Sequence, residues 1–164
     1  MTHENPEIIS RRDLVDYEIQ KMLTAELLLQ NHILAWSRAA ASPQLKETLN
    51  SYLGLVRQHI DMMGSFLDKE YIILRSFPNL VMRALVTETD LKLSYCRSAA
   101  TRDAGLLVNI LSVNDYKFSS YNTTAYLADM AGMKNQADIF RKIAENEKEI
   151  NERFLRLREY ATIY

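Results

Sequence analysis

The amino-acid sequence predicts an all-α protein: a four-helix bundle made of two antiparallel helical hairpins, joined by a connection containing one or two short helices. Two observations predict this fold. Glycine and proline are scarce, with four and three residues in a chain of 164, whereas a β-sandwich of this size needs many more turn residues. The chain also contains four long segments in which apolar residues recur every three or four positions, the period of an amphipathic helix.

The first hairpin is predicted from helices over residues 10–41 and 43–68. Ser42 and Pro43 separate them, because serine is a favoured N-cap and proline suits the first position of a helix. This leaves only a short turn between the two helices, and helices joined by a short turn pack antiparallel.

The second hairpin is predicted from helices over residues 102–131 and 135–160, the first of them beginning at Thr101-Arg102-Asp103. Gly132 is expected to end that helix in the left-handed conformation that glycine adopts readily. Residues 78–97 form the long connection between the hairpins.

Composition restricts the class of protein. Hydrophobic residues make up 48% of the chain, enough for a real core, and 20 Lys and Arg balance 21 Asp and Glu. This charge balance offers no field for nucleic acid or a membrane surface, and the single cysteine excludes an internal disulfide. Because we find no signal-peptide or membrane-span pattern, we expect a cytoplasmic protein: one bundle domain over residues 10–164 behind a flexible segment at residues 1–9.

Each predicted helix carries one stripe of residues expected to face the core, and each stripe has one strongly polar member: Glu26, His59, Asn114 or Glu147. The other stripe members are apolar or tyrosine: Val15, Ile19, Met22, Leu29, Ile33 and Trp36; Leu45, Leu49, Tyr52, Val56, Met63 and Phe66; Leu107, Leu111, Phe118, Tyr121, Ala125 and Ala128; Phe140, Ile143, Ile150, Phe154, Leu157 and Ala161.

The polar members are predicted to meet in the centre of the bundle. Glu26 and His59 lie equally far from the turn of their hairpin, about 25 Å at 1.5 Å per residue. In the other hairpin Glu147 is level with Lys117, and Asn114 lies one turn deeper. A buried carboxylate needs a proton or a cation, so two interpretations are open. Either Glu26, His59 and Glu147 hold a metal ion, or Lys117 and His59 compensate the two glutamates, and the residue types favour the second.

Three segments, over residues 39–67, 101–133 and 144–157, resemble the Yci-type (YciE/YciF-like) ferritin-like stress proteins of bacteria. The resemblance implies a ferritin-like four-helix bundle that is dimeric and linked to a stress response. Glu26, His59 and Glu147 match acidic and histidine positions of the family pattern. Asn114 and Lys117 stand where the family has metal ligands, as do Gly54, Leu55 and Asn146.

We therefore predict a degenerate metal site, with no catalytic residue, no resident cofactor and no dinuclear metal centre. The alternative is a metal-binding protein with oxidase or storage activity, in which Glu26, His59 and Glu147 hold a single iron, manganese or zinc ion. Carboxylate and imidazole ligands suit all three metals.

Apolar residues away from the stripe of the first helix predict self-association as a homodimer. Leu27, Leu28 and Leu34 lie on the side expected to face solvent, and exposed apolar patches mark interaction surfaces. The alternative is that the connection over residues 78–97 covers these leucines.

Overall fold

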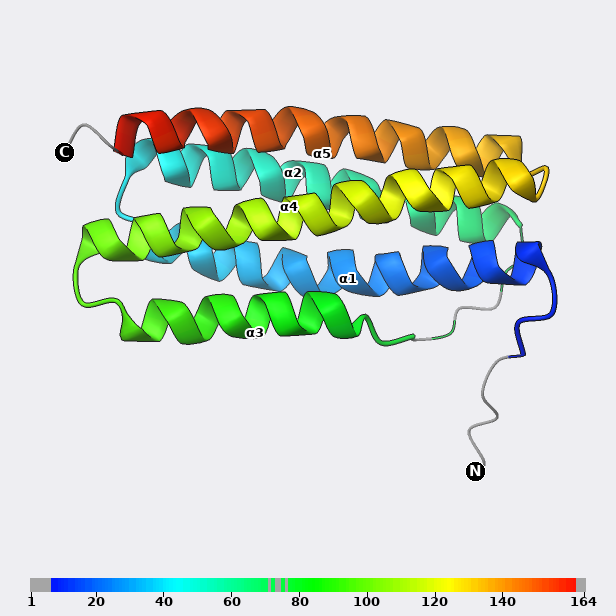
Figure 1. Ribbon diagram of the computed structural model, residues 1–164, viewed down its shortest axis with the longest axis horizontal. Helices are drawn as coiled ribbons and strands as arrows, with labels where there is room; N and C mark the ends of the chain where they lie inside the picture. The colour runs from blue at the N-terminus through cyan, green and yellow to red at the C-terminus, as the bar shows by residue number, and fades with distance from the viewer. Residues whose placement is uncertain (1–6, 71, 73–74, 76, 162–164) are drawn as a thin grey trace, which may run out of the picture.

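The computed structural model describes residues 7–70, 72, 75 and 77–161, with side chains described as far as residue 158. Within these residues the chain is all-α, as predicted, and contains no strand (Figure 1). Most of the predicted segment over residues 1–9 lies outside the described residues. The helices are α1 (Arg11–Ala39), α2 (Pro43–Lys69), α3 (Leu80–Tyr95), α4 (Ala99–Met130) and α5 (Lys134–Ala161).

The two predicted hairpins are present. Helix α1 packs along α2 and α4 packs along α5, while the shorter α3 packs on α4 and α1 at the outer edge of the bundle (Figure 1). Among its described residues, the connection between the hairpins therefore contains a single helix. No helix in the described part of the chain is long and apolar enough to cross a membrane.

The signals at the helix ends act as predicted in both hairpins. The side chain of Ser42 accepts a hydrogen bond from the backbone N–H of Leu45 at 3.3 Å, and Pro43 is the first residue of α2. Gly132 ends α4 with a φ of 70°, in the left-handed region where a β-carbon would be strained.

The start of α4 differs from the prediction. This helix begins at Ala99, three residues before the predicted start at residue 102. Its N-cap is Ser98, which exchanges hydrogen bonds with Thr101 in a capping box. Thr101 therefore stabilises the start of the helix from its third position and does not precede it.

The predicted core stripes of α1 and α2 are buried along their whole length. On α4 one position is wrong: Phe118 is 39% exposed, and the neighbouring Lys117 is fully buried in its place. Successive residues of a helix point about 100° apart, so the ion pairs that Lys117 makes inside the bundle turn Phe118 towards the surface.

Candidate functional site at the centre of the bundle

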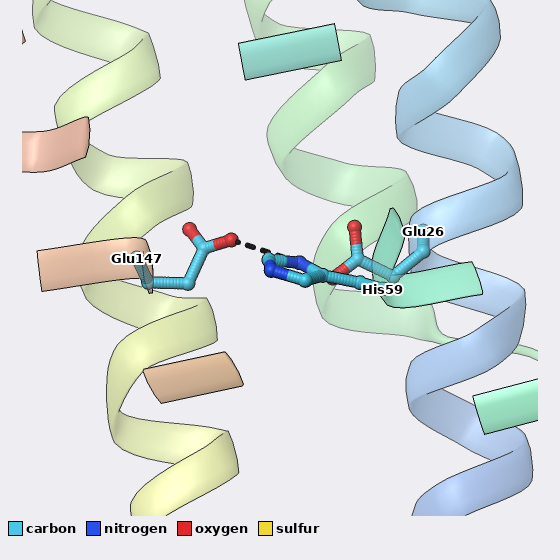
Figure 2. A group of neighbouring side chains, drawn as sticks. All are labelled: Glu26, His59 and Glu147. Carbon is cyan, nitrogen blue, oxygen red and sulfur yellow. Dashed lines mark hydrogen bonds and ion pairs between the residues drawn. The ribbon is translucent and has the colours of Figure 1, made fainter. Parts of the chain in front are cut away.

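Four charged or titratable side chains meet at the centre, one from each long helix. They are Glu26 of α1, His59 of α2, Lys117 of α4 and Glu147 of α5, and all four are completely buried. Figure 2 shows the imidazole of His59 between the two carboxylates. The sequence placed these residues at the same depth, and the structure brings them into contact.

Lys117 is the centre of this cluster. Its Nζ lies 2.5 Å from Glu147 Oε1 and 2.9 Å from Glu26 Oε2, and it donates a hydrogen bond of 3.1 Å to the hydroxyl of Tyr52. An ammonium has three N–H donors, and this one makes two ion pairs and one hydrogen bond. The positive charge is therefore fully compensated although water is excluded.

The remaining carboxylate oxygens accept hydrogen bonds from two buried tyrosines. Tyr121 donates to Glu26 Oε1 at 2.6 Å, and Tyr52 donates to Glu147 Oε2 at 3.1 Å. Together with the two ion pairs of Lys117, these bonds give each of the four carboxylate oxygens either a hydrogen bond or an ion pair. Such complete pairing is what makes buried charges tolerable in a low-dielectric interior.

His59 contacts both glutamates through one ring nitrogen. Its Nδ1 lies 3.3 Å from Glu26 Oε1 and 3.4 Å from Glu147 Oε1, so this nitrogen carries a hydrogen. Its Nε2 lies 3.2 Å from the side-chain amide nitrogen of Asn146, which is a donor. These partners fix the orientation of the ring, with Nδ1 towards the two carboxylates and Nε2 towards Asn146.

The two glutamates respond differently to their surroundings. Burial raises the pKa of Glu26, but the charge of Lys117 and the hydrogen bond from His59 outweigh it and hold this pKa below its usual value. Burial also raises the pKa of Glu147, where the attraction of Lys117 does not overcome burial and the charge of Glu26, so this pKa stays raised. Glu26 is therefore the carboxylate that remains ionised, and Glu147 takes up a proton more readily.

The other members of the cluster hold their protons tightly. Burial lowers the pKa of Lys117, but the charges of Glu147 and Glu26 raise it above its usual value. Burial, together with the same carboxylates, raises the pKa of Tyr52 and of Tyr121 well above the ordinary range. All three are therefore hydrogen-bond donors at neutral pH.

The donor set tests whether this site fits a metal. Glu26, His59 and Glu147 can each place one ligand atom within 4.8 Å of the others, which is enough for a single ion with a water ligand. A dinuclear centre does not fit, because it needs about six ligands, four of them carboxylates. Lys117 also competes with any ion for the same carboxylate oxygens.

Asn114, the fourth polar stripe residue, does not join the cluster. It is fully buried, and its amide group donates to the side chain of Asn151 at 3.3 Å, while its own oxygen has no partner. The sequence pattern placed Tyr52 and Tyr121 in the core stripes, but it did not show that their hydroxyl groups bond to the two glutamates. Their spacing was the available signal, since Tyr52 lies two turns before His59 and Tyr121 one turn after Lys117.

The fold and this centre define the class: an all-α four-helix bundle whose central layer is polar and charged. The chain belongs to the family described as "Domain of unknown function (DUF892)", whose model matches residues 10–162. This confirms that it is a Yci-type protein.

Comparison with individual proteins agrees with the family. The chain is 22% identical to Protein YciF of Escherichia coli K12 over 137 residues, which cover 83% of this chain and 82% of YciF. The crystal structure of the E. coli stress protein YciF superposes with a TM-score of 0.89 at 20% identity, covering 94% of this chain and 98% of YciF. YcfI of Rhodopseudomonas palustris gives 0.87 at 18% identity, covering 92% and 96%. At these identities the structural likeness shows the fold alone.

Proposed function

We propose that this chain is a non-catalytic, homodimeric bundle protein associated with a stress response, and that the charge of Lys117 replaces a metal at its centre. The observation that carries the proposal is the set of contacts around Lys117, in which one buried ammonium makes ion pairs with Glu26 and Glu147 and a hydrogen bond to Tyr52. A side chain that reacts with a substrate needs an atom that is free to contact it, whereas the polar groups of this cluster contact one another. The link to stress rests on the description of the relative YciF as a stress protein.

A second candidate function is binding of a single iron, manganese or zinc ion by Glu26, His59 and Glu147. The close approach of their ligand atoms favours it. In that case Lys117 must move away from both carboxylates when the ion enters, because the ammonium and the ion need the same oxygens.

Restoring acidic residues to α4 tests the proposal. The wild-type chain is expected neither to oxidise added ferrous iron nor to bind it in isothermal titration calorimetry. The double variant Asn114→Glu with Lys117→Glu replaces an amide and the ammonium by carboxylates, and it is expected to gain iron or manganese binding. Stoichiometric binding or ferrous oxidation by the wild type would overturn the proposal in favour of the second candidate.

A further inference from the structure

A cavity of about 320 Å³ lies at the end of the bundle where α1 begins. Its walls come from the segment before α1, from the first turns of α1 and from the connection between α2 and α3. Asp16 in its wall and Glu26 in the central cluster stand ten residues apart on α1, which is about 15 Å along the helix. The cavity is therefore separate from the central cluster, and its volume is within the range of small-molecule pockets, which begin at about 300 Å³.

One carboxylate in the wall of this cavity lacks a partner. Asp16 is partly buried, its Oδ1 is shielded from solvent, and it makes no hydrogen bond or ion pair with the described residues. Arg12, one turn earlier on α1, pairs with Glu70 at 3.3 Å. Burial raises the pKa of Asp16, and the attraction of Arg12 does not offset this. A cation in the cavity supplies the compensation that the neighbouring side chains do not give.

The charges that line the cavity favour a cation over an anion. Three carboxylates line it, those of Glu7, Asp13 and Asp16. Arg75 contributes the one guanidinium among the described lining residues. Hydrogen bonds from the backbone and the hydroxyl of Ser10 lower the pKa of Asp13, which keeps that carboxylate ionised. The lining is therefore negative in sum, and it attracts positively charged ligands.

Aromatic and aliphatic side chains complete the wall of the cavity. The rings of Tyr17 and Phe77 both line it, with centroids 4.9 Å apart and planes tilted by 56°. Ile8 and Ile72 add aliphatic surface. Aromatic rings attract ammonium groups through their faces and pack well against apolar groups. A carboxylate without a partner beside such rings matches a ligand that is charged at one end and apolar at the other.

We propose that this cavity, which we call the Asp16 cavity, binds a small organic amine. The protonated amino group pairs with Asp16, and the apolar stem of the amine packs against Tyr17 and Phe77. An amino group donates charge-assisted hydrogen bonds to a carboxylate, and the stem leaves water for an apolar wall. Neither a neutral molecule nor an anion of the same shape makes the first of these interactions. The proposal does not depend on whether Lys117 or a metal ion occupies the centre of the bundle.

Titration of the ¹⁵N-labelled chain with phenethylamine, followed by two-dimensional ¹H–¹⁵N NMR, tests the proposal. Chemical-shift changes are expected at the amides of the first turns of α1 and to be absent around Glu147, with a Kd of about 1 mM or tighter. Two matched ligands have the same shape: 2-phenylethanol without a charge and phenylacetate with a negative one. Each is expected to bind about 10-fold more weakly or less, since it cannot donate a charge-assisted hydrogen bond to Asp16.

Variants of the cavity wall separate the charge from the apolar contact. Asp16→Asn keeps the shape of the side chain and is expected to weaken phenethylamine binding by about 10-fold or more. Tyr17→Leu removes an aromatic ring and is expected to weaken it by about 3-fold. The matched control is Asp61→Asn, at an exposed aspartate of α2 that does not line the cavity, and it is expected to keep the wild-type affinity.

Urea unfolding of the free protein provides a second measurement. Asp16→Asn is expected to be at least as stable as the wild type, because it loses a carboxylate that burial disfavours. Preferential binding of phenethylamine that is lost in Asp16→Asn and kept in Asp61→Asn supports the amine site. Equal binding of 2-phenylethanol, tighter binding of phenylacetate, or no shift at the start of α1 with about 10 mM phenethylamine overturns it. An Asp16→Asn protein less stable than the wild type also overturns it, since Asp16 is then a structural residue.

Discussion

Replacing Lys117 by methionine is expected to destabilise the bundle by about 3–5 kcal/mol at neutral pH, the range for removing one partner of a buried ion pair. The interactions lost from the structure explain a destabilisation of this size. The substitution removes two ion pairs, at 2.5 and 2.9 Å, and the hydrogen bond to Tyr52. It leaves Glu26 and Glu147 facing each other in a layer that water does not reach, while the methionine side chain fills a similar volume.

The measurement is equilibrium unfolding in urea, followed by far-UV circular dichroism, for the wild type and Lys117→Met. The matched control is Lys142→Met, since Lys142 is an exposed lysine whose Nζ lies 3.8 Å from Glu145, and its loss is expected to change stability by less than about 0.5 kcal/mol. The deficit of Lys117→Met is expected to shrink as the pH falls towards 4, because the stranded carboxylates then take up protons. A Lys117→Met protein as stable as the wild type at pH 7 would refute the assignment of Lys117 as the compensating charge.

Three further predictions follow from the same contacts. Tyr121→Phe removes the 2.6 Å hydrogen bond to Glu26 and is expected to lower the free energy of unfolding in urea by about 1.5–3 kcal/mol. The control is Tyr126→Phe, at a tyrosine that is 68% exposed, which should change this free energy by less than about 0.5 kcal/mol. Equal effects of the two substitutions would contradict the role given to Tyr121. The free energy of unfolding is expected to fall as the pH rises above about 10, because the pKa values of Lys117, Tyr52 and Tyr121 are raised in the folded state and the unfolded chain releases these protons first. Each group contributes a slope of about 1.4 kcal/mol per pH unit. A double Tyr52→Phe, Tyr121→Phe variant with an unchanged alkaline slope would contradict this. Addition of EDTA is expected to leave the thermal midpoint unchanged, and a chelator-dependent fall of several degrees would show that a bound ion supports the centre.

Much of the fold could be predicted because its signals are local. Ser42 and Pro43 begin the second helix of the first hairpin, and Gly132 ends the first helix of the second, because of backbone preferences that belong to these residues themselves. The start of α4 was misplaced because Ser98 and Thr101 are both good capping residues, and which of them begins the helix depends on the path of the chain after α3. The error at Phe118 has another origin: the stripe pattern placed this aromatic residue inside, although Lys117 beside it was already expected to compensate the glutamates, and successive residues of a helix cannot both face the core.

The membership of the central cluster was also predictable in large part. Glu26, His59 and Glu147 interrupt apolar stripes at matching depths, which is visible along the sequence. The hydrogen-bond partners were not, because the contact between Asn146 and His59, or between Tyr121 and Glu26, depends on how the two hairpins are rotated against each other. The sequence pattern also placed Asn114 with the cluster, although its amide turns to Asn151 on the neighbouring helix.

Metal content shows whether Lys117 or a bound ion supplies the positive charge at the centre of this bundle. The wild-type protein would be expressed in medium supplemented with iron, manganese and zinc, purified without chelators, dialysed, and analysed by inductively coupled plasma mass spectrometry. We expect far less than one ion of any of these metals per chain. One or two ions per chain, retained through dialysis, would contradict it.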